Sequence, residues 1–191
     1  MLIIVSGFAG SGKSSLTDSL GKELGMKIIH ASALLKEMRT EGIGALEKEN
    51  IEKIKDWWES EEAKEFMKKR QKDTSLDEAL DKKLLETAEK GTVVLDSWTM
   101  PYLYKGEAIR IWLDASPETR AKRVASRDNR DYEEVLAKIR ARDEETKSLY
   151  ERLYHFKMGE NLKVFELVVD TNNLNQEEVF EKVIEKIRES E

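Results

Sequence analysis

The residues with the clearest chemical meaning form one continuous segment. Residues 7–14 read Gly-Phe-Ala-Gly-Ser-Gly-Lys-Ser and match the pattern G-x-x-x-x-G-K-[ST] at every fixed position. In this pattern the glycines let the backbone curl, so that consecutive N–H groups point at phosphate oxygens. We therefore expect this segment and the residue after it to bind nucleotide phosphates, with contacts from Gly7, Ala9, Gly10, Ser11, Gly12, Lys13, Ser14 and Ser15.

Lys13 and Ser14 carry the two side chains that this chemistry needs. The lysine ammonium reaches the β- and γ-phosphates, and the serine hydroxyl is a ligand for Mg²⁺. Both lie at the start of a predicted helix, whose N-terminus adds positive potential. A chance glycine turn is the alternative interpretation. An apolar strand before the loop and a helix with Leu16, Leu20 and Leu24 after it favour a site for ATP and Mg²⁺ instead.

A carboxylate follows a second apolar run, Val93-Val94-Leu95. This residue, Asp96, therefore stands at the carboxyl end of a predicted strand, where ligands bind in open α/β sheets. Two roles for it stay open: it holds Mg²⁺ through water, or it takes a proton from a hydroxyl acceptor. The alternative is an aspartate that only ends the strand.

Arginines gather in the second half of the chain. Arg120, Arg123 and Arg127 have the spacing of one helix face, and the charged stretch after them contains Arg130, Arg140, Arg142 and Arg152. Guanidinium groups suit bidentate phosphate contacts, so these residues predict a segment that closes over phosphates. A solvated helix with Glu–Arg pairs is the alternative.

The elements that must position these residues alternate between strand and helix. Apolar runs predict strands at 2–6, 27–30, 92–96, 109–113 and 165–169, and helical spacing predicts helices after the loop and around 32–38, 76–88, 117–127 and 180–187. Such alternation is typical of a parallel sheet with helices on both faces.

Composition excludes several other classes of protein. The 191 residues include 33 basic and 39 acidic side chains, and the net charge of -6 argues against a non-specific nucleic-acid binder. The absence of cysteine excludes thiolate metal sites, and two histidines, His30 and His155, do not make a histidine-rich centre. No apolar run approaches the ~18 residues of a membrane span. The apolar run at residues 1–5 is too short for a signal peptide and has no basic leader, so we expect no signal peptide here. We expect a cytoplasmic protein whose partner is a small phosphate acceptor, neither nucleic acid nor membrane.

These motifs and their order resemble one family, the small P-loop nucleoside-monophosphate kinases, and most closely the archaeal-type cytidylate kinases. The similarity covers the phosphate loop and residues 27–37, 76–96, 109–127, 140–154 and 166–179. It implies an α/β fold with a five-stranded parallel sheet flanked by helices, in a single domain over 1–191. The implied parts are a core of 1–30, 74–127 and 158–191, a helical acceptor-binding insertion at 31–73 and a mobile lid at 128–157.

The resemblance also implies an activity and the residues that carry it. The implied reaction moves the γ-phosphoryl group of Mg·ATP to a nucleoside monophosphate such as CMP or dCMP. Arg123 and Arg127 fall where the family's lid hinge contacts the donor nucleotide, and Arg140 and Arg142 fall where its lid arginines hold the phosphates during transfer. Asn173 lies in a tail, 167–174, that is similar to the family's adenine-side loop.

The acceptor half departs from the family's pattern. Residues 31–36 read Ala-Ser-Ala-Leu-Leu-Lys where the family has an S-A-G-x-x-F-R-like segment, and Ser97-Trp98 stands in place of a G-R pair. Lys36 is thus a point charge where the family has a guanidinium fork. We expect the acceptor site to be lined by Ser32, Lys36 and Trp98, whereas Trp57 and Trp58 either stack on a base or pack the insertion against the core.

Two other functions stay open at this point. A kinase for a hydroxyl acceptor, a nucleoside or another small metabolite, explains the missing arginines and makes Asp96 the base. A nucleotide-binding regulator with weak or no turnover would bind ATP tightly and release no acceptor-dependent ADP.

Overall fold

The protein is built on five parallel strands in the order β2-β3-β1-β4-β5. This computed structural model describes residues 1–40, 65, 68–70 and 72–189. The predicted α/β fold is therefore confirmed, with the sheet formed by β1 (Leu2–Ser6), β2 (Lys27–His30), β3 (Val93–Asp96), β4 (Ile109–Asp114) and β5 (Leu167–Asp170).

The central strand is β1, and its position determines where the phosphate loop lies. It pairs with β3 on one side, Leu2 opposite Val93, and with β4 on the other, Ile3 opposite Ile109. Because both of its faces are covered, its apolar run has no polar alternation. The connection after β1 leads to β2 on one side, and the connection after β3 leads to β4 on the other side, so the chain changes direction between β1 and β3. The loop at the carboxyl end of β1 therefore lies beside the crevice where such sheets bind ligands.

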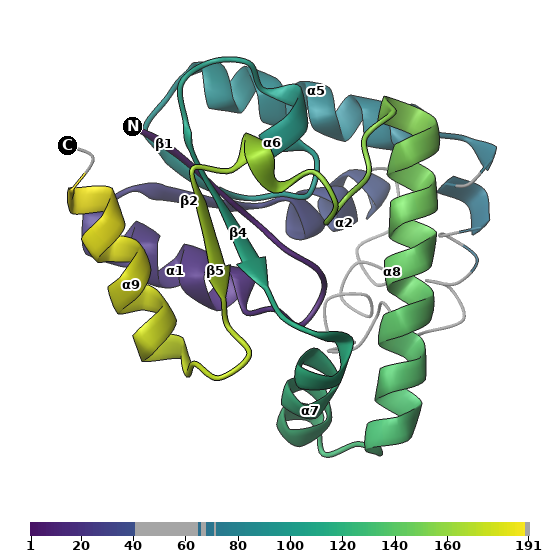
Figure 1. Ribbon diagram of the computed structural model, residues 1–191. Helices are drawn as coiled ribbons and strands as arrows, with labels where there is room; N and C mark the ends of the chain where they lie inside the picture. The colour runs from purple at the N-terminus through teal and green to yellow at the C-terminus, as the bar shows by residue number, and fades with distance from the viewer. Residues whose placement is uncertain (41–64, 66–67, 71, 190–191) are drawn as a thin grey trace.

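Two sets of helices cover the two faces of the sheet (Figure 1). On one face, α1 and α9 pack on Ile3 and Val5, and on the other face α2, α5 and α6 pack on Leu2 and Ile4. The bounds of these helices are α1 (Lys13–Leu24), α2 (Ala31–Thr40), α5 (Ser75–Glu89), α6 (Met100–Leu103) and α9 (Gln176–Arg188).

The charged stretch forms a long helix, α8 (Tyr132–Tyr154), which follows α7 (Pro117–Asp128). Its first half packs on α7 through Val135 and Ile139, and its second half places Leu149 and Tyr150 in an aromatic cluster with Trp112 of β4. Because the apolar residues of α8 belong to two separate clusters, they do not form one continuous stripe along the helix.

One predicted boundary differs from the structure near this aromatic cluster. The last strand begins at Leu167 rather than at Phe165, because a 3-10 turn, η2 (Leu162–Val164), precedes it and Phe165 packs in the cluster instead. Pro101 and Tyr102 lie in helix α6, and the Tyr102 ring stacks on Phe156 at 3.9 Å between centroids.

A buried polar network joins α5 to its neighbours. The Asp81 carboxylate of α5 accepts hydrogen bonds from Thr99 Oγ1 at 2.5 Å and from the Tyr154 hydroxyl of α8. One turn earlier on α5, Asp77 forms a buried ion pair with Arg70. Burial raises the pKa of the Asp81 carboxyl to about 6, although both hydrogen bonds act in the opposite direction.

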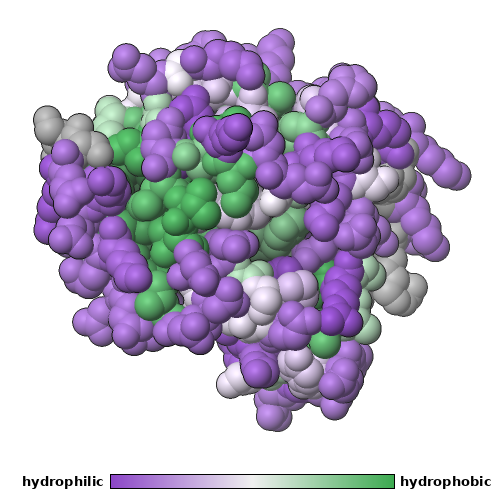
Figure 2. Space-filling view, viewed as in Figure 1, coloured by the Kyte–Doolittle hydropathy of each residue, from purple (hydrophilic) through white to green (hydrophobic). Residues whose placement is uncertain are grey.

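Most of the predicted acceptor-binding insertion, including Trp57 and Trp58, lies outside the described residues. The view in Figure 2 is dominated by hydrophilic side chains, apart from an apolar patch in the region of β5, where Val168 is 44% exposed. In the described part of the chain, no helix combines the length and the apolar content that crossing a membrane requires.

Candidate nucleotide-phosphate site

The loop between β1 and α1 has a backbone that glycine alone adopts without strain. Gly7, Gly10 and Gly12 have φ angles of 146°, 80° and 98°. A Cβ atom on Gly7 would lie 2.6 Å from the carbonyl oxygen of Leu113, so a side chain there would collide with β4. The two glycines that the motif fixes, Gly7 and Gly12, thus have the backbone conformation that favours glycine, and so does Gly10, which the motif leaves variable.

Lys13 and Arg142 converge on the indole ring of Trp98. The Lys13 ammonium lies 5.6 Å from the ring centroid, and the guanidinium carbon of Arg142 lies 5.7 Å from it. Trp98 Nε1 donates a hydrogen bond of 2.7 Å to the carbonyl of Gly7. Trp98 therefore connects the end of β3 with the phosphate loop and with α8, next to the predicted phosphate-binding lysine.

Burial lowers the pKa of the Lys13 ammonium, and the nearby charges of Arg142 and Arg120 lower it further, while Asp96 acts in the opposite direction. Lys13 also donates a weak hydrogen bond of 3.3 Å to the carbonyl of Phe8. Cations crowded in this way are stabilised by an anion, and phosphate is the anion that the loop geometry suits.

Ser14 and Asp96 meet as the sequence predicts. Ser14 Oγ donates a hydrogen bond of 2.8 Å to Asp96 Oδ2, which brings together the start of α1 and the end of β3. Burial raises the pKa of the Asp96 carboxyl, but the Lys13 charge and the hydrogen bonds from His30 and Ser14 outweigh it, so the net shift is downward. Asp96 is consequently a carboxylate at neutral pH.

His30 is a third partner of this carboxylate. At the end of β2, its Nδ1 lies 3.3 Å from Asp96 Oδ2 and its Nε2 lies 2.9 Å from Asp18 Oδ1 on α1. The hydrogen bond with Asp96 raises the pKa of the His30 imidazole, against the effect of burial. From the sequence, His30 is predicted to end a strand near the acceptor cleft, and a structural role is the favoured interpretation. Its two partners, Asp96 and Asp18, come from other elements.

Arg120 of α7 anchors the loop from the other side. Its guanidinium donates to the carbonyls of Ala9 and Ala115 at 3.0 Å each and forms a bidentate pair with Asp143 of α8. The sequence grouped Arg120 with the phosphate-binding arginines. In the structure its side chain is 2% exposed and its charge is paired with Asp143.

Three other predicted arginines have protein partners in this structure. Arg123 donates to Thr171 and to the carbonyl of Leu174, and so holds the turn between β5 and α9. Arg127 pairs with Asp128, and Arg140 pairs with Glu118, in both cases with an arginine side chain that is more than half exposed. Among the four arginines predicted to be catalytic, Arg142 is the one that shares an aromatic ring with Lys13.

The remaining predicted site residues occupy the rim of this region. Ser15 is half-buried in the first turn of α1, Ser32 is exposed and Lys36 half-buried on α2, and Asn173 is exposed in the turn that Arg123 holds. Their contacts with a nucleotide stay predictions.

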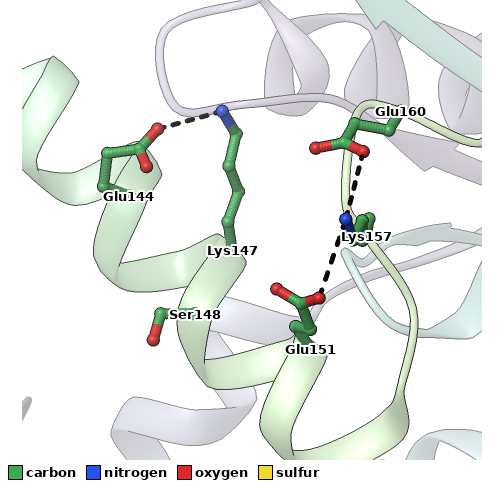
Figure 3. A pocket seen from close by; sticks show the side chains of 6 residues that line it. All are labelled: Glu144, Lys147, Ser148, Glu151, Lys157 and Glu160. Carbon is green, nitrogen blue, oxygen red and sulfur yellow. Dashed lines mark hydrogen bonds and ion pairs between the residues drawn. The ribbon is translucent and has the colours of Figure 1, made fainter.

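A pocket of about 230 Å³ opens beside α8, and Asp96 is not among the residues that line it. One lining residue, Lys147, contacts the phosphate loop: its Nζ lies 5.6 Å from the ring centroid of Phe8. Its two lysines form ion pairs with its own glutamates, as Figure 3 shows for Glu144, Lys147, Glu151, Lys157 and Glu160. With three glutamates against two lysines, the lining of the pocket has a net negative charge, which does not suit a triphosphate.

The donor groups of the loop fit a nucleotide phosphate and Mg²⁺. Ser11 Oγ is buried and has no hydrogen-bond partner among the described residues, which suits a hydroxyl beside an anion. The hydroxyl and carboxylate oxygens of Ser14 and Asp96 are the hard ligands that Mg²⁺ takes, usually one or two from protein together with water and phosphate. No group of three or more histidine, cysteine, aspartate or glutamate side chains that could hold a metal ion occurs in the described part of the chain.

Comparisons with known proteins agree with this geometry. The model of the cytidylate kinase-like family matches residues 2–173. A cytidylate kinase of Pyrococcus abyssi is 30% identical over 94% of this chain and 90% of its own length, and one of Ignicoccus hospitalis is 30% identical over 95% of this chain and 96% of its own.

Solved structures share the fold at lower identity. An uncharacterized protein from Eubacterium ventriosum has a TM-score of 0.62 at 17% identity, with 98% of each chain covered. A shikimate kinase from Bacteroides thetaiotaomicron has a TM-score of 0.57 at 16% identity, over 99% of this chain and 98% of that one. Together with the phosphate loop, these similarities identify the fold as that of the P-loop kinases.

Proposed function

Because the chain belongs to the cytidylate kinase-like family, we propose that it transfers the γ-phosphoryl group of Mg·ATP to a nucleoside monophosphate, and that this acceptor is CMP or dCMP. The observation that carries the proposal is the meeting of Lys13, Ser14 and Asp96 at the carboxyl ends of β1 and β3. Cytidylate kinases that align over nearly the whole chain support the choice of acceptor.

Positioning and charge neutralisation account for most of the catalysis of phosphoryl transfer. The loop amides and Lys13 orient the β- and γ-phosphates, and Ser14 and Asp96 hold Mg²⁺, which when bound neutralises charge on the phosphate oxygens. The acceptor's phosphate oxygen attacks the γ-phosphorus, the bond to the bridging oxygen breaks, and ADP leaves. No general base is required, because a phosphate monoester is already ionised at neutral pH.

The arginines have separate tasks in this proposal. Arg142 stands next to Lys13 and neutralises the transferring group, while Arg140, whose side chain is exposed, reaches the phosphates when 128–157 closes as a lid. Arg127, whose side chain is also exposed, contacts the donor nucleotide at the hinge of this lid. Arg123 holds the turn from Thr171 to Leu174, so that Asn173 faces the adenine side. Closure excludes water, which would otherwise compete as the acceptor.

On the acceptor side we assign Ser32, Lys36 and Trp98. Lys36 attracts the acceptor phosphate as a point charge. The indole of Trp98, which contacts Lys13 and the Gly7 carbonyl, lines the acceptor site beside the phosphate loop. A hydroxyl acceptor is the second candidate, and one observation favours it: an uncharged ring, rather than a cation, follows β3 beside Lys13. In that case Asp96 accepts the proton of the hydroxyl.

ADP production from Mg·ATP across a panel of acceptors tests the proposal. The panel contains all nucleoside monophosphates, their deoxy forms and the matching nucleosides. We expect strong stimulation by CMP or dCMP alone. Stimulation by a nucleoside would show that the acceptor group is a hydroxyl and not a phosphate. Tight ATP binding with no acceptor-stimulated ADP production would indicate a nucleotide-binding regulator.

Replacing the loop lysine tests the donor half separately. Lys13→Ala removes the ammonium that stabilises the charge developing on the phosphates, and we expect kcat to fall by about 100- to 1,000-fold. Lys22→Ala, in the last turn of the same helix, is the matched control and should leave kcat unchanged. Near-normal activity of the Lys13 variant would contradict the assignment of the loop.

A further inference from the structure

Both side-chain contacts of the Asp96 carboxylate are made through the same oxygen, Oδ2. Ser14 Oγ and His30 Nδ1 both contact Oδ2, at 2.8 Å and 3.3 Å, and no described residue bonds Oδ1. The carboxyl group is buried, with a side chain 8% exposed. The two contacts on one oxygen fix the rotation of the carboxylate and leave its other oxygen to a ligand.

The other ring nitrogen of His30 also has a side-chain partner. Its Nε2 contacts Asp18 Oδ1 at 2.9 Å, so that an unbroken chain of side chains runs from α1 through β2 to β3. The Asp18 side chain is 62% exposed, whereas that of His30 is 26% exposed. Asp18 is on the same helix as Ser14, one turn later, and both contacts of Asp96 therefore depend on how α1 sits against the sheet.

We propose that His30, anchored by Asp18, is a positioning residue that orients Asp96 for Mg²⁺ bound with the nucleotide. The inference rests on the proposed function, because it takes Asp96 as the residue that holds the ion. Groups that orient metal-binding carboxylates in this way have a measurable effect, since their loss commonly costs about 10- to 100-fold in metal affinity or activity.

The coupling between Mg²⁺ and nucleotide binding gives a readout that is independent of turnover. Calorimetry measures the Kd of ADP with and without Mg²⁺ for the full chain. For His30→Ala we expect the enhancement of ADP affinity by Mg²⁺ to fall by about 10-fold, with the Mg²⁺-free Kd unchanged. His30→Asn keeps a polar group near the position of Nδ1 and should recover most of the enhancement, and Asp18→Ala should lose a smaller part of it.

Glu23→Gln is the matched control on α1, since Glu23 pairs with Arg188 rather than with the site. Kinetics supply a second readout: kcat at low Mg²⁺ should fall in His30→Ala while the KM for the acceptor stays constant. Unchanged Mg²⁺ enhancement in His30→Ala would overturn the inference, and so would an equal loss of ADP affinity with and without Mg²⁺, which indicates damage to the fold.

The two proposals fail in different ways. If no acceptor in the panel is phosphorylated but His30→Ala still loses the Mg²⁺ enhancement, the proposed acceptor is wrong and the positioning role stands. If CMP or dCMP is phosphorylated and the enhancement in His30→Ala is normal, the positioning role is wrong and the proposed function stands.

Discussion

Asp96 is the residue at which the two candidate acceptors make opposite demands. For a phosphate acceptor it holds Mg²⁺, and for a hydroxyl acceptor it takes a proton. The pKa of its carboxyl is lowered by Lys13, His30 and Ser14 against the effect of burial. A carboxylate of low pKa suits an ion ligand better than a base that works near neutral pH.

Asp96→Asn separates these demands. An amide retains one neutral oxygen, so the variant should bind Mg²⁺ more weakly, and we expect activity to drop by about 10- to 100-fold at low Mg²⁺ and to recover as Mg²⁺ is raised. Steady-state rates over a Mg²⁺ series measure this recovery. Asp114→Asn, at the exposed end of β4, is the control. Failure of raised Mg²⁺ to rescue activity would favour proton transfer to Asp96.

How far single residues could be predicted depends on whether their partners are close in the sequence. The phosphate loop was predictable because its chemistry lies in eight consecutive residues. Ser14 and Asp96 followed from the rule that strand ends meet at one edge. The His30 contacts could not be foreseen, because nothing in the sequence indicates which aspartate a strand-end histidine reaches.

Two helices, α7 and α8, are connected through one buried ion pair and one exposed ion pair. Arg120 and Asp143 are buried, whereas Arg140 and Glu118 have side chains that are 59% and 45% exposed. Water screens the exposed pair, so the two pairs should contribute very differently to stability although they join the same two helices.

Asp143→Ala should lower the free energy of unfolding by about 3–5 kcal/mol, because it leaves the buried Arg120 charge without its partner. Arg140→Ala breaks the exposed pair and should cost about 1 kcal/mol or less. Urea unfolding of both variants measures the difference. Equal effects would show that the buried Arg120–Asp143 pair stabilises the fold no more than the exposed pair does.

Helices could be predicted from the sequence where all of their apolar residues lie on one face and pack in one hydrophobic cluster. The residues Leu80, Leu84 and Ala88 of α5 face a single cluster, and their spacing predicted the helix. In α8 the apolar residues divide between two clusters, so charge dominated the pattern and a continuous helix of 23 residues was not evident. The Arg120–Asp143 pair was hidden for the same reason, since it needs the packing of α8 on α7.

The stability of the whole molecule should depend on pH through Asp81, which joins α5 to α6 and α8. The pKa of its carboxyl is about 6 in the folded chain, against roughly 3.9 in an unfolded chain. Between these values the folded chain holds more protons than the unfolded one. The contribution of this group to the free energy of unfolding therefore falls as pH rises from about 4 to about 6.

Asp81→Asn removes this titration and keeps an oxygen for Thr99 to donate to. Relative to the unsubstituted chain, the variant should gain about 3 kcal/mol between pH 4 and pH 7, since each pKa unit corresponds to about 1.4 kcal/mol. Urea unfolding at several pH values measures this gain. Glu86→Gln, on the exposed side of the same helix, should show no comparable dependence, and a flat difference for Asp81→Asn would refute the role of this carboxyl.

The central place of β1 has a consequence for biosynthesis. Its two neighbours begin at Val93 and Ile109, so the strand that carries the phosphate loop stays unpaired on the ribosome until about half of the 191 residues have emerged. Long-range pairing of this kind is slow to form. The ability to bind nucleotide therefore arises late in translation. A nucleotide that binds only the folded chain then shifts the folding equilibrium of the completed chain toward the folded state.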